Sequence, residues 1–238
     1  MMMLRSLRSD LLKIRRKGLW FLVVAAPLGL VAMQGLNFGL RYDYLSDRYK
    51  EDLWGGLISN INPFIPMALF LGCTLVSSLA ANIEHQMSSW KQLLALPISR
   101  SAVFLAKLLL CVLLLTVSCV LLPFFTAGLG FLLGFQSPLP LSDLLGMGFY
   151  PYLAAWPLLA LQLWLSVTFR NQALPVSLGV GAAVISPFMG NLSEWLPLNW
   201  PMLALVEASR LIFIISGVVL GIVLALLSLA HFNRKDVD

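Results

Sequence analysis

Charged side chains are scarce in this sequence: Asp, Glu, Lys and Arg make up 11% of its 238 residues, against about 25% in soluble domains. Hydrophobic residues make up 59%, more apolar surface than a soluble core of this length can bury. Asp, Glu, Lys and Arg are absent from six long runs, 18–40, 53–83, 108–142, 144–169, 171–193 and 211–233. A bilayer crossing needs about 20 such residues. We therefore predict an all-α polytopic membrane protein with six transmembrane helices.

The groups that common enzymes use are also scarce. The chain has two histidines, His85 and His231, and its three cysteines all lie inside apolar runs. It contains no HExxH zinc motif, no GxSxG nucleophile elbow and no carboxylate pair at helical spacing within a span. These absences argue against a catalytic or metal site. The GxxxxGK[ST] loop that cradles ATP phosphates is missing too, so an energy source would have to be supplied by another chain.

The basic residues are distributed unevenly along the chain. With six spans and a cytoplasmic N-terminus, twelve of the 16 Lys and Arg residues fall on the cytoplasmic side, as the positive-inside rule requires. The net charge of +5 is thus an orientation signal and not a sign of nucleic-acid binding. We expect both termini in the cytoplasm and spans at about 18–40, 61–82, 103–123, 149–169, 172–190 and 211–231.

Residues 1–17 form a separate basic segment ahead of the single transmembrane domain, 18–238. Leu4, Leu7, Leu11 and Ile14 recur at helical spacing, and most of the basic residues avoid that stripe. The pattern predicts an amphipathic cytoplasmic helix lying in the membrane surface, with its basic groups at lipid phosphates. A simple topology anchor is the plainer interpretation, and the two are compatible.

Between spans 5 and 6, residues 186–210 are too broken by Pro and Asn to cross a bilayer and too apolar for a free loop. We expect short re-entrant helices there, with Trp195 and Trp200 as interfacial anchors. On the outer side, the charged and tyrosine-rich segment 41–54 is either a solvated loop or a contact for a peptide substrate.

A few polar side chains occur within the predicted spans. They are Gln34, Asn37, Asn60, Asn62 and Gln162. Two interpretations stay open: they line a substrate path, or they make interhelical hydrogen bonds.

The largest cytoplasmic connection is 84–100, EHQMSSWKQLLALPISR. Met87, Trp90 and Leu94 share a helical face, Pro97 stops the helix, and Ser99 or Ser101 can cap the next one. An exposed helix with an aromatic and a basic residue is more than a connector needs. The alternative is that Trp90 and Lys91 anchor a loop at the interface.

This segment resembles the one between spans 2 and 3 of type-2 ABC exporter permeases, in which an acidic residue ends span 2 and a Pro-x-Ser-Arg motif precedes a Lys in span 3. The matching residues are Glu84, Trp90, Lys91, Leu94, Pro97, Ser99, Arg100 and Lys107, whereas Ser89 replaces a common glycine. The resemblance extends to the whole architecture. In size, the chain is most similar to the permeases of bacteriocin, lantibiotic and other peptide-antibiotic immunity systems.

The resemblance implies that segment 84–100 is a coupling helix docking on a separate ABC ATPase subunit, in two copies, which would bind ATP and magnesium. It also implies a second permease, identical or a sister, and a place in the bacterial cytoplasmic membrane. The substrate would be an amphipathic antimicrobial peptide or a similar hydrophobic compound.

Glu84 is expected to pair with Arg100 or Lys107 across the corner between spans 2 and 3. A non-transporting accessory or scaffold subunit and an intramembrane enzyme remain the alternatives.

Overall fold

The computed structural model describes residues 2–15, 18–86, 99–191, 193–206, 208 and 210–234, and this part of the chain is almost entirely helical. In a protein that lies in lipid, helices satisfy every backbone group within one segment. The elements are α1 (Met2–Ile14), α2 (Leu19–Leu40), α3 (Tyr42–Arg48), α4 (Leu53–Ile61), η1 (Asn62–Phe64), α5 (Ile65–Gln86), α7 (Arg100–Leu132), α8 (Leu141–Ala154), α9 (Trp156–Thr168), α10 (Ala173–Ile185), η2 (Ser186–Asn191), α11 (Trp200–Leu203) and α12 (Arg210–Arg234).

Four stretches of helix are long and apolar enough to cross a membrane: 19–40, 53–85, 100–132 and 210–234. A fifth crossing is formed if α8 and α9, which meet at an angle of 50°, count as one broken span. Pro157 stands at the start of α9 and has no backbone N–H to continue the hydrogen bonding of α8, which favours a break there. The apolar helix 173–188 is shorter, so the described residues contain four or five such spans, and the number six stays a prediction.

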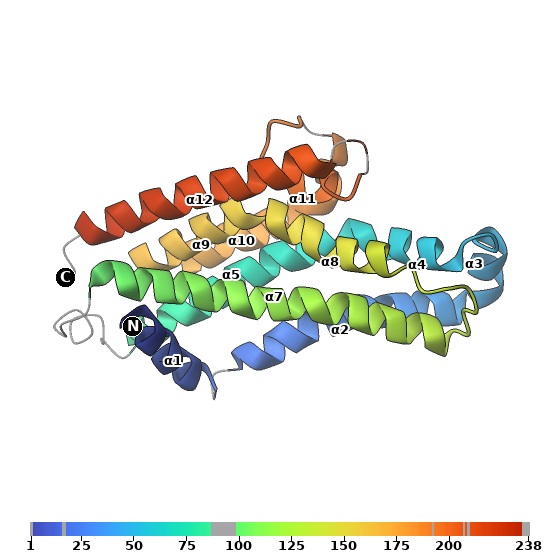
Figure 1. Cartoon of the computed structure of the whole chain (residues 1–238), viewed down its shortest axis with the longest axis horizontal. Coiled ribbons are helices and arrows are strands. Elements are labelled where there is room, and N and C mark those ends of the chain that lie inside the picture. Colours follow the sequence, from blue (N-terminus) through green and yellow to red (C-terminus); the bar gives the residue numbers. More distant parts are fainter. Residues whose placement is uncertain are drawn as a thin grey trace.

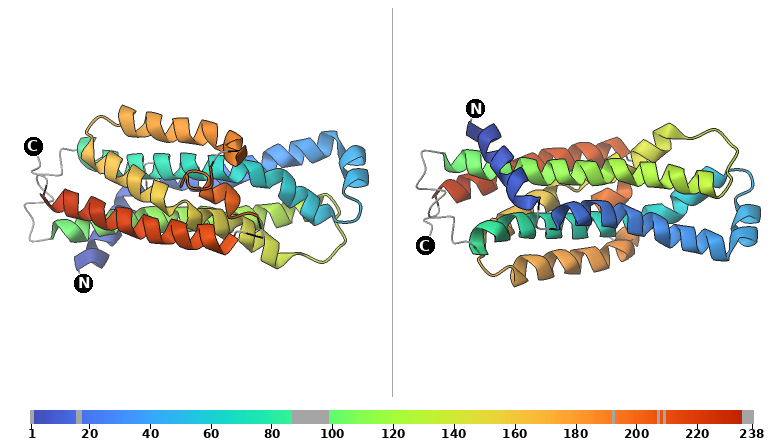
Figure 2. Two further views of the ribbon diagram at one scale, coloured as in Figure 1. Left: turned by 90° about the horizontal axis from the view of Figure 1, so that it is seen from above. Right: turned by 90° about the horizontal axis from the view of Figure 1, so that it is seen from below.

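The helices form an elongated bundle (Figure 1), with both ends of the chain at one end and α3 at the other. Helix α7 packs against α1, α2 and α8, while α5 packs against α9 and α10. The views from above and below show α10 on one flank of the bundle, beside α5 (Figure 2). The end that carries the termini also carries the end of α5 and the start of α7, so the coupling segment connects two helices at that end.

Small residues permit close contacts between helices, as is common in membranes. A Cβ atom added at Gly148 of α8 would lie 2.5 Å from the Cys119 carbonyl oxygen of α7. One added at Gly217 of α12 would lie 2.5 Å from Ala154 Cα. These two glycines therefore set how closely α8 approaches α7 and α12.

At the far end, α7 contains the predicted span 103–123 and continues through Pro123 to Leu132. The buried Trp54 ring of α4 packs edge-on against Phe131 and Phe135, with ring centroids 5.7 and 5.3 Å away. Its indole Nε1 donates to the Ser137 carbonyl at 3.2 Å. This contact ties α4 to the end of α7 and to the loop that follows.

Two of the predicted surface segments contain short helices. Segment 41–54 forms α3 and the start of α4, and segment 186–210 forms η2 and α11. Whether the latter enters a leaflet stays a prediction. Trp195 is 91% exposed, which is compatible with an interfacial anchor, and Trp200 donates from Nε1 to the Glu194 carbonyl at 2.8 Å.

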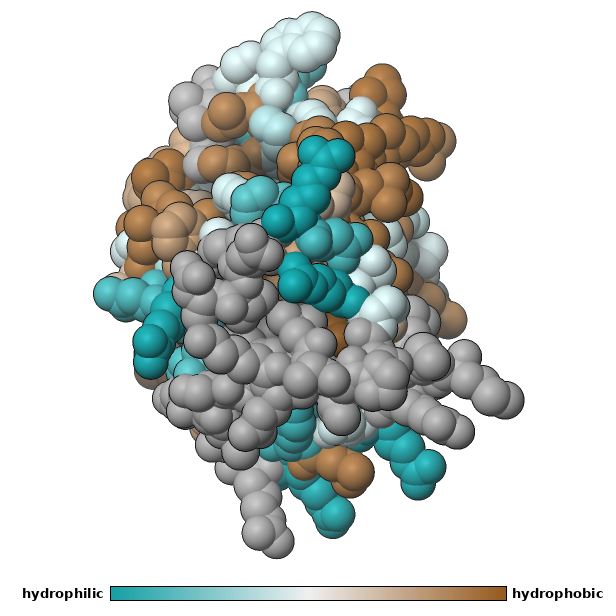
Figure 3. Space-filling view, turned by 90° about the vertical axis from the view of Figure 1, so that its left-hand side faces the viewer, coloured by the Kyte–Doolittle hydropathy of each residue, from teal (hydrophilic) through white to brown (hydrophobic). Residues whose placement is uncertain are grey.

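The sides of the bundle are apolar, and its terminal end is polar. On α12, for example, large hydrophobic side chains such as Leu211, Ile215 and Leu227 are at least 60% exposed, as expected of a helix that faces lipid. Viewed onto the end that carries the termini, hydrophilic residues gather around the grey atoms, with hydrophobic residues at the margins (Figure 3).

Candidate coupling site

The predicted coupling residues fall into two groups. Trp90, Lys91, Leu94 and Pro97 lie outside the described residues, so their contact with an ATPase stays a prediction. The other four, which flank the segment on α5 and α7 or at the start of α7, are described. They are Glu84, Ser99, Arg100 and Lys107.

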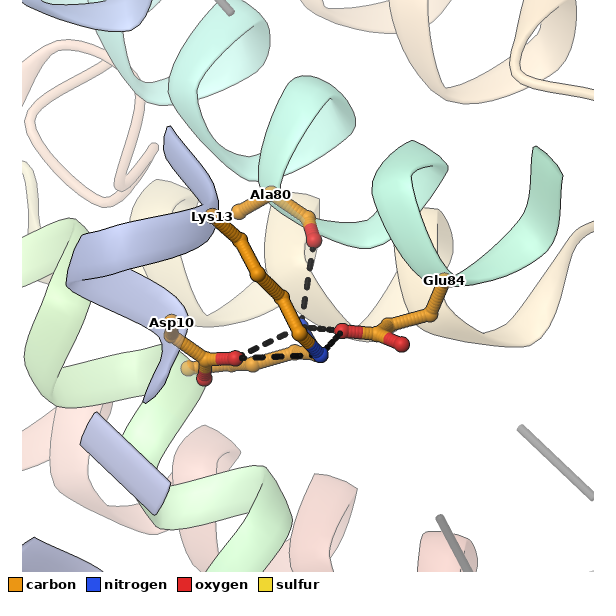
Figure 4. A network of polar contacts seen from close by, with 5 residues as sticks. Asp10, Lys13, Ala80 and Glu84 are labelled. Carbon is orange, nitrogen blue, oxygen red and sulfur yellow. Dashed lines mark hydrogen bonds and ion pairs between the residues drawn. The ribbon is translucent and has the colours of Figure 1, made fainter. Parts of the chain in front are cut away.

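Glu84 lies near the end of α5 and is almost completely buried. Its Oε1 atom accepts from Lys13 Nζ at 2.7 Å and from Lys107 Nζ at 3.5 Å. Lys107 Nζ also donates to the Ala80 carbonyl one turn earlier in α5, at 3.1 Å. In Figure 4, dashed lines join the ammonium groups of the two lysines to Ala80 and Glu84 of α5 and to Asp10 of α1. Glu84 thus joins the surface helix α1 to the corner between α5 and α7.

Asp10 completes the cluster from α1. Its Oδ1 atom lies 3.9 Å from Lys107 Nζ and 4.0 Å from Lys13 Nζ. Its Oδ2 atom is buried and has no hydrogen-bond partner in the described part of the chain. Burial raises the pKa of Asp10 above its ordinary 3.8, and the nearby Lys107 and Lys13 oppose that rise.

We refer to Asp10, Lys13, Glu84 and Lys107 as the charge cluster. It combines two carboxylates with two ammonium groups, and three of its four side chains are at most 6% exposed. Isolated charges at such depth would be costly, whereas charges in a balanced and hydrogen-bonded group compensate one another. Because its members come from α1, α5 and α7, the charge cluster holds these three helices in a defined arrangement at the base of the coupling segment.

The start of α7 is fixed in a second way. Ser99 is the N-cap of this helix, and its Oγ accepts from the Ala102 amide at 3.2 Å. Arg100 donates to the Asn233 carbonyl at 3.4 Å, and the Asn233 amide donates to Ser101 Oγ at 2.9 Å. The first turn of α7 is therefore attached to the last turn of α12.

The expected ion pair across the corner is present between Glu84 and Lys107. Among the described residues, the ion-pair partners of Glu84 are Lys107 and Lys13; Arg100 instead bonds to Asn233. Asp10 and Lys13 were not among the predicted site residues. The sequence does hold one signal: Asp10 lies three residues after Leu7 and four before Ile14, on the apolar face of α1.

The polar residues within the spans mostly bond to neighbouring protein groups. Gln34 Nε2 donates to the Asn60 carbonyl at 2.9 Å, and Asn37 donates to Gln34 Oε1 at 3.1 Å. Asn60 donates to the Gly56 carbonyl and to Tyr49 Oη. The bond from Gln34 to the Asn60 carbonyl links α2 to α4, and the other bonds lie within one helix or lead to Tyr49.

Gln162 and Asn62 are placed differently. The buried Gln162 amide faces α10, where its nitrogen can donate to the Pro175 carbonyl at 3.2 Å while its oxygen accepts from the Gly179 amide at 3.1 Å. Asn62 Oδ1 is buried without a hydrogen-bond partner among the described residues. Gln162 thus links α9 to α10, and a role for any of the five residues in a substrate path stays a proposal.

Comparison with known proteins agrees with this architecture. A family model described as "ABC-2 family transporter protein" matches residues 6–186, which is most of the chain. No curated protein matches, and no solved structure does. The matched range includes most of α1, the whole coupling segment and all four residues of the charge cluster. The chain belongs to the ABC-2 family of transporter proteins and is accordingly a membrane permease component of an ABC transporter.

Proposed function

We propose that this permease is the membrane subunit of an ATP-driven exporter that removes amphipathic antimicrobial peptides, or similar hydrophobic compounds, from the bacterial cytoplasmic membrane. The observation that carries the proposal is the buried charge cluster at the base of segment 84–100, within a chain of this family. A rigid base is what a coupling helix requires, because a displacement of that helix then moves α1, α5 and α7 together.

In this proposal, the chain itself has no catalytic site. Two copies of a separate ATPase subunit bind ATP and magnesium and press on the coupling segment through Trp90 and Leu94. A second permease, identical or a sister, supplies the other half of the pathway. Both termini and the charge cluster lie on the cytoplasmic side, as the placement of basic residues favours.

Two substitutions in the coupling segment test the ATPase contact. Docking an aromatic or leucine side chain contributes about 1.5–3 kcal/mol, so we expect Trp90→Ala or Leu94→Asp to weaken ATPase association at least tenfold. The measurement is co-purification of the ATPase with the tagged permease, together with peptide-stimulated ATP hydrolysis. Trp195→Ala, which removes a tryptophan that is 91% exposed, is the matched control and should change neither quantity.

Membrane insertion and purified yield must stay normal in all three variants. If the Trp90 and Leu94 variants retain full association and turnover, segment 84–100 is not the coupling helix. If no ATPase co-purifies with the unmodified chain, a non-transporting scaffold subunit becomes the better description.

A further inference from the structure

An apolar groove of about 580 Å³ opens on the side of the bundle between α2 and α5, with α7 as its floor. Its lining is formed by aliphatic and small side chains, among them Leu22, Ala26, Met33, Ala68, Leu75 and Leu115. The hydrogen-bonded polar residues of α2 and α4 are not part of this lining. The groove is thus suited to hydrocarbon, and no described residue of the charge cluster or of the coupling segment lines it.

The length of the groove matches one leaflet. Its lining on α2 extends from Leu22, near the start of that helix, to Met33, which at 1.5 Å per residue is about 16 Å. Half of a hydrocarbon core of about 30 Å is about 15 Å. The groove therefore begins close to the surface helix α1 and ends near the middle of the bilayer, as an acyl chain does.

Basic residues precede the start of the groove in the sequence, at the end of α1 and in its connection to α2. Lys13, 31% exposed, and the exposed Arg15 lie where α1 ends, and Arg16 and Lys17 follow in the sequence. The acidic partners of Lys13 point inward, since Glu84 and Asp10 are 1% and 5% exposed. Lys13 and Arg15 thus reach the surface at this corner, whereas the two carboxylates are buried.

We propose that this groove is a binding site for one anionic phospholipid of the cytoplasmic leaflet, with its acyl chains between α2 and α5 and its headgroup phosphate at Lys13 and Arg15. Charge complementarity and the one-leaflet length together favour this occupant over a protein helix, which needs no cationic mouth. The site goes beyond the proposed export function. The test below uses the purified permease in detergent and needs neither ATP nor transport.

The experiment compares phosphatidylglycerol with phosphatidylcholine of identical acyl chains. Bound lipid is counted by native mass spectrometry, and the melting temperature is recorded at each lipid concentration. We expect about one tightly bound phosphatidylglycerol per chain and a higher melting temperature with it than with phosphatidylcholine. Arg15→Gln should reduce the preference roughly fivefold, which corresponds to the about 1 kcal/mol that one cation contributes at a membrane surface. Arg41→Gln, at the other end of α2, should leave it unchanged.

A matched pair on α2 tests the groove itself. Ala26 lines the groove, whereas Val24, on the same helix, is 39% exposed and lies outside the lining. Ala26→Phe should abolish retention of the lipid, and Val24→Phe should not. Because a bulky side chain can disturb folding, Ala26→Cys and Val24→Cys provide a second measurement: phosphatidylglycerol should slow maleimide labelling of the former at least tenfold and leave the latter unaffected. Both cysteine variants are made in a chain whose native cysteines are replaced by serine, because Cys119, although buried, also lines the groove.

Three results would overturn the proposal. The first is equal lipid retention in Ala26→Phe and Val24→Phe, with labelling at both cysteines independent of lipid. The second is equal binding of both lipids that Arg15→Gln does not change. The third is efficient crosslinking between two chains at Ala26→Cys, together with protection of that cysteine from maleimide that increases with protein concentration. This result would assign the groove to a second copy of the chain.

Discussion

Lys107 is buried in the protein interior with 2% of its side chain exposed, and it meets carboxylates from two directions, Asp10 on α1 and Glu84 on α5. At this scale the balance of charge matters more than any single bond. Removing one partner of a buried ion pair leaves an uncompensated charge, whereas removing both leaves a smaller defect. Here the defect is smaller still, because Asp10 and Lys13 remain as a pair.

We therefore expect Glu84→Gln and Lys107→Met each to lower the free energy of unfolding by about 3–5 kcal/mol. The double variant should lower the free energy of unfolding by clearly less than the sum of the two, because it leaves neither charge of the pair buried without its partner. Chemical denaturation in detergent measures the free energy of unfolding of the unmodified chain, the two single variants and the double variant.

The exposed pair Asp47–Lys50, with side chains 83% and 73% exposed, is the control. Its disruption by Asp47→Asn or Lys50→Met should cost only about 0–1 kcal/mol. Strictly additive losses at Glu84 and Lys107 would show that the two charges act independently, and the charge cluster would then not be a unit.

At the scale of elements, the arrangement of the helices depends on where their backbones approach closely. Helix α1 is held by its apolar side chains Leu7 and Ile14, which are 8% and 1% exposed, as well as by the charge cluster. Helix α8 approaches α7 at Gly148, and α12 approaches α8 at Gly217. A side chain at either glycine would have to displace a helix backbone, not merely another side chain.

Gly148→Ala and Gly128→Ala form a matched pair for this contact. The added Cβ at position 148 would lie 2.5 Å from the Cys119 carbonyl oxygen, while at position 128 of α7 nothing lies within 4 Å. We expect Gly148→Ala to destabilise the protein by about 1–3 kcal/mol, as overpacked sites do. Gly128→Ala should be neutral or slightly stabilising because alanine is the better helix former.

Thermal unfolding of both variants in the same detergent provides the comparison. An unchanged melting temperature in Gly148→Ala would mean that α8 can shift away from α7 without loss. Gly148 would then not be what sets the distance between α8 and α7.

At the scale of the whole molecule, the two chain ends, the end of α5 and the start of α7 are at one end of an elongated apolar bundle, and α3 is at the other (Figure 1). An even number of crossings, such as the predicted six, would produce this arrangement. Family membership makes this chain a membrane permease component, and the placement of basic residues favours the end with the termini as the cytoplasmic one.

Cysteine labelling of intact cells tests that orientation. A cysteine introduced by Ser46→Cys, on α3, should react with a membrane-impermeant thiol reagent added outside. One introduced by Ser89→Cys, in the coupling segment, should react only after the cells are opened. The native cysteines are buried, so background labelling should be small. The opposite pattern would reverse the orientation and remove the coupling segment from the reach of a cytoplasmic ATPase.

The sequence by itself determined the class of protein, an all-helical membrane protein, and the approximate places of its longest apolar helices. In lipid, each backbone segment has to satisfy its own hydrogen bonds, so each long uncharged apolar run is mostly helical, although its length does not show where a helix ends or breaks. An ion pair at this corner was predictable because consecutive spans return antiparallel beside each other, but the sequence left open whether Arg100 or Lys107 is the partner of Glu84. The stripe of Leu7 and Ile14 likewise indicated which side of α1 is buried.

Only the tertiary structure decided which distant residues complete these features. Asp10 and Lys13 join the charge cluster because α1 folds back against α7 and α5, and no local pattern encodes the partner of a surface helix. The same holds for Gln34 and Gln162, whose hydrogen-bond partners lie on other helices, and for the groove between α2 and α5. Hydrophobicity places a helix in the membrane but does not determine its rotation about its own axis. Contacts between helices depend on that rotation, and they form only when the helices pack.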